Sequence, residues 1–172
     1  LGPAIGWTEE GIEAMERKNV SAVQTVYNIL EQTPGNELIE RGAAKDVGIL
    51  VRVPDASGIL TGKVDENTKI DEKDHRSVRK GEWIKASLKK VDLLRPIAER
   101  NGLSIIELAI KFIISKNSVS SVLPTVISEE EIERFAAMSD GNYLSSSDMK
   151  EIDELYNSWW KESPYELKAT VQ

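Results

Sequence analysis

Short apolar segments alternate along the chain with segments that favour helices, and this alternation restricts the fold more than any other feature of the sequence. The clearest apolar segment, residues 47–53, reads VGILVRV, as is typical of a strand covered on both faces. Residues 20–28 and 119–123 predict two further strands, because their valines suit a strand better than a helix.

Helices are predicted between and after these strands. Ser104 and Glu107 have the spacing of a capping box, in which each side chain bonds to the backbone of the other residue. Ser128 and Glu131 form a second such pair, and Pro96 is expected to kink or split the helix that contains it. The predicted helices span about residues 8–18, 34–45, 82–101, 104–116, 128–138 and 148–160.

Strands that are separated by helices pair in parallel, so we expect the three strands to be neighbours in one sheet, in chain order. Three short strands are too small a sheet for the helices predicted around them. A (β/α)8 barrel normally needs about 250 residues. The 172 residues, 1–172, are therefore expected to be one incomplete domain of a larger α/β protein.

The start of the chain agrees with this expectation. Leu1 is not an initiator methionine, and no charged and then apolar leader follows it. We therefore expect that an N-terminal part precedes it.

The composition excludes several classes of function. The chain has 22 Lys or Arg and 29 Asp or Glu residues, a net charge of −7, which argues against a nucleic-acid partner. It has no cysteine and one histidine, His75, which excludes disulfides, thiolate metal sites and multi-histidine metal sites. The longest apolar segment, residues 105–114, is too short and too charged to cross a membrane. We expect a cytoplasmic protein without a metal site, a membrane segment or a nucleic-acid partner.

Four segments carry motifs that recur together in one family. Residues 23–28 read VQTVYN, residues 51–63 VRVPDASGILTGK, residues 103–112 LSIIELAIKF and residues 122–132 VLPTVISEEEI. In this order, and over almost the whole chain, they resemble the aldo-keto reductase family. The resemblance implies a (β/α)8 TIM barrel, of which this chain would hold roughly the last three βα units plus a C-terminal helix, with residues 1–3 just leaving the fifth strand.

The resemblance also implies an activity, the reduction of an aldehyde or ketone by hydride transfer from NADPH or NADH. The dinucleotide would be held in an extended form, without a Gly-x-Gly-x-x-Gly motif. The family's catalytic Asp, Tyr, Lys and His lie on earlier strands, so no catalytic residue is assigned and the chain alone is expected to be inactive. It would supply cofactor binding, and its partners would be the N-terminal half of the same barrel and a small carbonyl substrate. The alternative is a non-catalytic nucleotide-binding or interaction protein that retains the fold without the catalytic tetrad.

Two strand residues are candidates for the nicotinamide end. The Gln24 amide lies in an apolar strand, where it either holds the nicotinamide carboxamide, as the resemblance implies, or is satisfied by neighbouring barrel side chains. Arg52 stands where the family usually carries an aromatic ring that stacks on the nicotinamide, and a planar guanidinium also stacks on a ring face. The alternative for Arg52 is an ion pair with a carboxylate, such as a barrel aspartate of the missing half.

The loop after the second strand is a candidate pyrophosphate clamp. Glycines let backbone amides approach phosphate oxygens, and a lysine adds a positive charge. Without the resemblance, an ordinary loop with turn glycines explains the same residues. The candidates are Ser57, Gly58, Leu60, Gly62 and Lys63.

The segment after the last strand resembles the family's last nucleotide-binding loop. Ser128 is also a simple N-cap, and the helix N-terminus behind it attracts phosphate. Ile127 stands where many members have a basic residue and is predicted to pack against Ile132 as a hydrophobic staple, while Phe135 stands where they have Asn. Arg134 either supplies the lost charge or lies in solvent, so the sequence does not choose between NADPH and NADH. The candidates here are Thr125, Ser128, Glu131 and Arg134.

Overall fold

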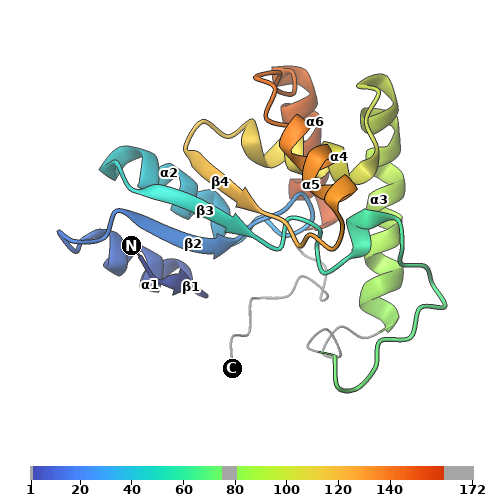
Figure 1. Cartoon of the computed structure of the whole chain (residues 1–172), viewed down its shortest axis with the longest axis horizontal. Coiled ribbons are helices and arrows are strands. Elements are labelled where there is room, and N and C mark those ends of the chain that lie inside the picture. The colour runs from blue at the N-terminus through green and yellow to red at the C-terminus, as the bar shows by residue number, and fades with distance from the viewer. Residues whose placement is uncertain (1, 75–80, 161–172) are drawn as a thin grey trace.

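Four parallel strands form one sheet, with α1 and α2 beside it and α3 to α6 beyond the other end of the strands in the view of Figure 1. It is seen in a computed structural model that describes residues 2–74 and 81–160. The strands lie side by side in chain order, which confirms the predicted parallel neighbours. They are β1 (Ala4–Ile5), β2 (Ala22–Val26), β3 (Gly48–Arg52) and β4 (Val119–Leu123).

Helices connect the strands and follow the last one. Among the described residues, one helix lies in each of the first two connections, and a short 3-10 turn and two α-helices lie between β3 and β4. Among residues 2–74 and 81–160, no helix has both the length and the apolar composition needed to cross a membrane. The helices are α1 (Thr8–Met15), α2 (Gly35–Lys45), the 3-10 turn η1 (Ile59–Thr61), α3 (Gly81–Arg100), α4 (Ile105–Ile114), α5 (Glu129–Ala137), α6 (Ser146–Leu155) and the π-helical turn η3 (Tyr156–Trp160).

The short strand β1 is the element that the sequence did not predict. Ala4 pairs with Gln24 and Ile5 with Thr25, so the chain still belongs to the sheet after residues 1–3. Two residues are too few for the alternation by which a strand is recognised in a sequence. The described chain therefore adds a fourth strand to the three that the sequence predicts.

The two faces of the sheet differ in their covering. Side chains on one face are fully buried where α1, α2 and α4 pack, namely Val23, Thr25, Ile49 and Val51. The alternate side chains Gln24, Leu50 and Arg52 are only partly buried. In a (β/α)8 barrel the face away from the helices lines the barrel interior. The expectation that residues 47–53 are covered on both faces therefore holds for only one face of the described chain.

Helix α3 is continuous through Pro96, so the expected split does not occur. Proline removes the hydrogen bond to the carbonyl four residues earlier, which belongs to Asp92. Both Pro96 and Asp92 are exposed, so water can satisfy that carbonyl.

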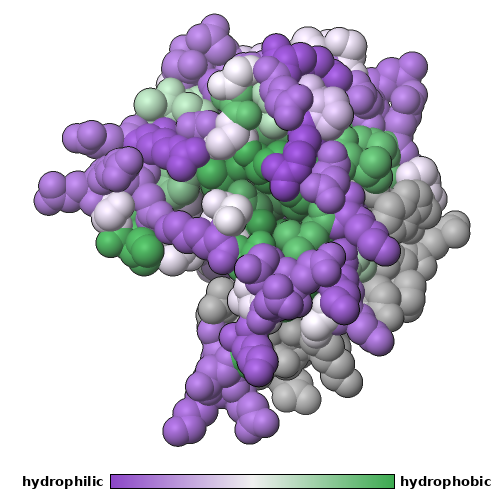
Figure 2. All heavy atoms as spheres, turned by 90° about the vertical axis from the view of Figure 1, so that its right-hand side faces the viewer, coloured by the Kyte–Doolittle hydropathy of each residue, from purple (hydrophilic) through white to green (hydrophobic). Residues whose placement is uncertain are grey.

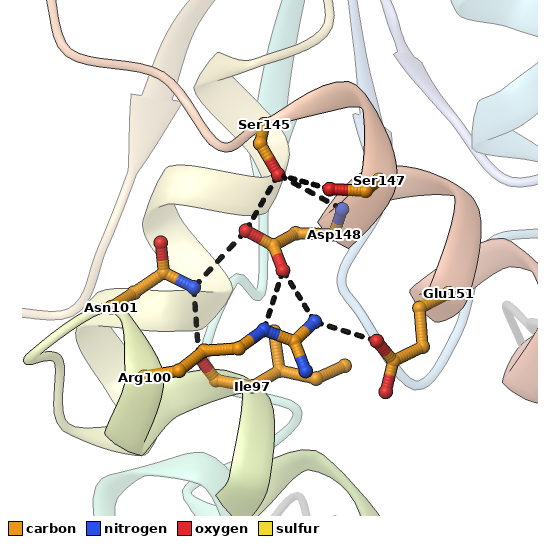
Figure 3. A network of polar contacts seen from close by, with 7 residues as sticks. All are labelled: Ile97, Arg100, Asn101, Ser145, Ser147, Asp148 and Glu151. Atoms are coloured by element: carbon orange, nitrogen blue, oxygen red, sulfur yellow. Dashed lines mark hydrogen bonds and ion pairs between the residues drawn. The ribbon is translucent and has the colours of Figure 1, made fainter.

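A polar network around Asp148 joins the end of α3 to the start of α6 (Figure 3). Arg100 Nε donates to Asp148 Oδ1 at 2.7 Å, and Ser145 Oγ donates to Asp148 Oδ2 at 2.8 Å. Asn101 Nδ2 reaches the same carboxylate at 3.2 Å, and Arg100 Nη2 also donates to Glu151 Oε2 at 2.6 Å. Burial raises the pKa of Asp148, but the bonds from Arg100, Ser145 and Asn101 outweigh it and hold the pKa below its ordinary value. The network fixes α6 against α3.

Candidate functional site

Gln24 and Arg52 lie on the same face of the sheet, on adjacent strands. Gln24 pairs with Leu50 and Val26 with Arg52, so Arg52 lies one pleat further toward the C-terminal ends of the strands. These ends point toward the side of the molecule shown in Figure 2, where hydrophobic residues gather in the middle and hydrophilic ones surround them. The structure thus places the two strand candidates on one face of adjacent strands, with Arg52 at the C-terminal end, where barrel enzymes carry their chemistry.

The Arg52 side chain is incompletely satisfied. Its Nε atom is buried and has no hydrogen-bond partner in the part of the chain that the structure describes. A buried donor without a partner costs free energy, so such atoms are rare and call for an explanation. Arg52 is therefore a donor that an acceptor or an aromatic ring at the strand end would satisfy.

The loop after β3 has an unusual backbone. Val53, Ala56 and Ser57 have positive φ angles of 59°, 50° and 59°, and Gly58 follows at 94°. A positive φ is costly for residues other than glycine, above all for a β-branched valine, and such strain gathers at functional sites. The sequence gives no signal for the strain at Val53, Ala56 or Ser57, because none of these residue types favours a positive φ.

This loop is also firmly held. Asn28 Nδ2 donates to the Val53 carbonyl at 3.0 Å, and the Leu60 amide donates to the Asp55 carbonyl at 3.1 Å. Leu60 is fully buried, whereas Gly62 and Lys63 are exposed. The loop therefore presents Gly62 and Lys63 from a fixed base, although they fall within a segment that the sequence pattern leaves without secondary structure.

An ion pair brings this loop to the start of α5. Lys63 Nζ lies 3.1 Å from Glu131 Oε1, across 68 residues of sequence. Ser128 caps α5 as predicted, because its hydroxyl accepts from the Glu131 amide. The predicted capping box is only half formed, since Glu131 Oε2 accepts from the Ile127 amide at 3.0 Å rather than from that of Ser128. Two candidate segments, distant in sequence, thus meet at Glu131.

The predicted staple between Ile127 and Ile132 is wrong. Ile127 is 77% exposed and Ile132 is 56% exposed, so neither buries its side chain. Thr125, another candidate in this segment, is also exposed. None of the nine residues of α5 is fully buried either.

Arg134 is engaged rather than free in solvent. Its Nε donates to Glu107 Oε1 at 2.9 Å, and its Nη2 donates to Ser104 Oγ at 2.6 Å. Ser104 and Glu107 also form the predicted capping box of α4. The Arg134 bond, with help from Ser104, lowers the pKa of Glu107 to about 2. Arg134 therefore ties α5 to the start of α4.

A cavity of about 280 Å3 lies between the loop after β3, the end of α3 and the starts of α4 and α5. The sequence did not predict that Arg95, Leu103 and Ser104 line this cavity. Arg95 has the pattern of a charge on a helix surface, and Leu103 and Ser104 have the pattern of a helix start. The lining includes Leu60, Gly62, Arg95, Leu103, Ser104 and Arg134.

Tyr27, just after β2, is a structural residue. Its hydroxyl donates to Asn36 Oδ1 at 2.8 Å, and its ring stacks on Phe112 with centroids 5.5 Å apart. Burial, together with the nearby charge of Asp153, raises the pKa of Tyr27 well above its ordinary value. Tyr27 is thus poorly suited to give up a proton at neutral pH.

The sequence model of the aldo/keto reductase family matches residues 4–157, and the chain belongs to this family. Solved structures of similar fold include the glycerol dehydrogenase AKR11B4 from Gluconobacter oxydans, with a TM-score of 0.77 and 19% identity over 91% of this chain and 48% of that one. The aldo-keto reductase AKR11C1 from Bacillus halodurans in its holo form has a TM-score of 0.65 and 19% identity over 90% and 49%. The fold is therefore part of an aldo-keto reductase TIM barrel.

Curated relatives are longer than this chain. The L-glyceraldehyde 3-phosphate reductase of Escherichia coli (strain K12) is 25% identical over 138 residues, which cover 76% of this chain and 40% of that protein. A probable voltage-gated potassium channel subunit beta of Oryza sativa subsp. japonica is 28% identical over 115 residues, or 63% of this chain and 35% of that protein. The matches thus span 40% or less of these two relatives.

Proposed function

We propose that this chain is the cofactor-binding half of an NAD(P)H-dependent oxidoreductase that reduces small aldehydes or ketones. The carrying observation is the buried Nε of Arg52 at the C-terminal end of β3, which has no hydrogen-bond partner among residues 2–74 and 81–160. Either a nicotinamide ring stacked on the guanidinium face or a carboxamide oxygen in the guanidinium plane would give this side chain a partner. The residues present therefore fit the cofactor that the family implies.

Three groups of candidate residues would each bind one part of the dinucleotide. Gln24 and Arg52 would orient the nicotinamide, which supplies the hydride when bound. Residues Ser57, Gly58, Leu60, Gly62 and Lys63 would hold the pyrophosphate, as the positive φ angles and glycines of their loop favour. The adenosine end would then fall to the segment that meets this loop at Glu131, with its candidates Thr125, Ser128, Glu131 and Arg134.

The complete enzyme would need the other half of the barrel. β1 and β4 each have one strand neighbour in the described chain, so each leaves an edge open. A (β/α)8 barrel has eight strands, and an N-terminal half would pair with both edges and supply the catalytic residues that the family carries on its earlier strands. Residues 1–172 would then form one domain with that half, and a cytoplasmic location would suit this cofactor.

Cofactor binding by the Arg52→Ala variant tests the proposal. Loss of the guanidinium should weaken the binding of NADH or NADPH by about tenfold, the effect of losing one well-desolvated stacking or hydrogen-bonding contact. The measurement is a titration of cofactor fluorescence. The control is Arg41→Ala, which removes an exposed arginine from α2 on the helix side of the sheet. Equal effects of the two variants would contradict the proposed site.

A second candidate function is a non-catalytic nucleotide-binding or interaction protein. The similarity to a protein named as a probable potassium channel subunit beta favours it. The intact mass of the purified protein separates the two candidates, because a reductase needs a preceding half. A native polypeptide that starts near Leu1 would favour the interaction protein.

A further inference from the structure

The start of α5 is occupied by a carboxylate of its own chain. Glu131 Oε2 accepts from the Ile127 amide at 3.0 Å, and Glu131 Oε1 lies 3.1 Å from Lys63 Nζ. The Ile127 amide first and Lys63 second lower the pKa of Glu131, so its carboxylate is charged at neutral pH. A backbone amide and an ammonium are the donors that a phosphate group would use at a helix start. Glu131 already takes both.

The other cations around the neighbouring cavity are also paired. Arg134 donates to Glu107, and Arg95 Nε donates to Asp92 Oδ1 at 2.9 Å. A 2′-phosphate on the adenosine ribose would therefore meet carboxylates here and would have to displace an existing ion pair to gain a cation.

We propose that Glu131 makes this site select NADH over NADPH. The inference rests on the proposed function, which assigns the adenosine end to the junction of Lys63 and Glu131. A carboxylate accepts a hydrogen bond from the 2′-hydroxyl of an adenosine ribose, as it does in NAD sites of the Rossmann fold. The 2′-phosphate of NADPH carries about −1.5 to −2 charges at pH 7, and the same carboxylate repels it. Selectivity then arises from repulsion of the wrong cofactor as well as from attraction of the right one.

Binding constants for the two dinucleotides test this selectivity. NADH should bind the chain at least about tenfold more tightly than NADPH in a titration of cofactor fluorescence. Two probes without nicotinamide, 5′-AMP and adenosine 2′,5′-bisphosphate, should differ in the same direction in a calorimetric titration. Equal or tighter binding of NADPH would overturn the selectivity while leaving the proposed function intact. Failure of both dinucleotides to bind would overturn the proposed function and this inference with it.

The Glu131→Gln variant isolates the charge, because glutamine keeps an oxygen that accepts from the Ile127 amide. Its expected effect is a loss of the NADH preference to within about threefold, mainly through tighter NADPH binding. The matched control is Glu130→Gln, an exposed glutamate of the same helical turn, which should keep the preference. Far-UV circular dichroism and the unfolding midpoint check that both variants fold alike. An equal change of the preference in both variants would assign it to the overall charge of α5 and would overturn the role of Glu131.

Discussion

Arg52 combines a stability cost with a binding opportunity. A buried donor without a partner weakens the folded state, and replacement of unsatisfied polar groups by apolar ones is often neutral or stabilising. In the proposed site the bound cofactor would give the donor its missing partner. An apolar residue at this position would lack that contact, so the cofactor would bind more weakly.

This view predicts opposite effects of Arg52→Met on stability and on binding. The free energy of unfolding in urea should stay unchanged or rise by up to about 1 kcal/mol, while cofactor affinity falls. Arg134→Met is the contrasting variant, because it removes a guanidinium that bonds to Glu107 and Ser104, and it should lower stability. A clear loss of stability in Arg52→Met would mean that its side chain has a partner in the folded chain.

The pair of Glu107 and Arg134 predicts a pH dependence. The pKa of Glu107 falls from 4.5 to about 2, because Arg134 and Ser104 bond to the charged carboxylate. A lowered folded-state pKa means that the pair stabilises the fold fully above about pH 4.5 and loses this effect as the pH falls toward about 2. The difference in unfolding free energy between the wild type and Arg134→Gln should shrink over this window. A difference that stays constant would show that Arg134 does not act through Glu107.

At the scale of elements, the sequence predicted what depends on periodicity and caps. The valine-rich strands and the Ser104 capping box appear as expected, because both are local patterns with a local cause. β1 escaped prediction because its two residues form a strand only through pairing with β2. The positive φ of Val53 could not be predicted from the sequence, because the surrounding loop imposes it. The ion pair of Lys63 and Glu131 could not be predicted from the sequence either, because it depends on tertiary structure.

The connection between α5 and α6 depends on a buried lysine of α4. The Lys111 side chain is 6% exposed, pairs with Asp140, and donates to the carbonyls of Met138 and Asn142 at 2.9 Å and 2.6 Å. Lys111→Met should lower the free energy of unfolding by about 1–3 kcal/mol, because it leaves these acceptors without their donor. Urea denaturation measures the loss. Lys150→Met is the control, since that lysine is 76% exposed and its pair with Glu154 contributes about 0–1 kcal/mol. Equal losses in the two variants would contradict an anchoring role for Lys111.

At the scale of the whole molecule, the open face and the open edges of the sheet have the same explanation, namely that the described strands form only part of a barrel. The partly buried Gln24, Leu50 and Arg52 lie on the face that a closed barrel would enclose. β1 and β4 would each gain a neighbour in the same closure, which removes the unpaired edges of the described sheet. Completion of the barrel would therefore bury the apolar surface, satisfy the strand edges and enclose the cofactor in a single step.

The 172-residue chain alone should show no reductase turnover. Carbonyl reduction needs an acid at the carbonyl oxygen as hydride arrives, and a tyrosine serves at neutral pH only when a neighbouring charge such as a lysine lowers its pKa. Tyr27, the tyrosine next to the end of β2, is buried and its pKa is raised instead. A separately produced N-terminal half, mixed with this chain, should restore cooperative unfolding and cofactor-dependent reduction of an aldehyde together, because one closure of the barrel supplies both. The assay follows the absorbance of the reduced cofactor with a reactive aldehyde, for each half alone and for the mixture. Oxidation of NADH or NADPH by the isolated chain, well above the uncatalysed background, would show that it holds an acid of its own and would contradict this division of labour.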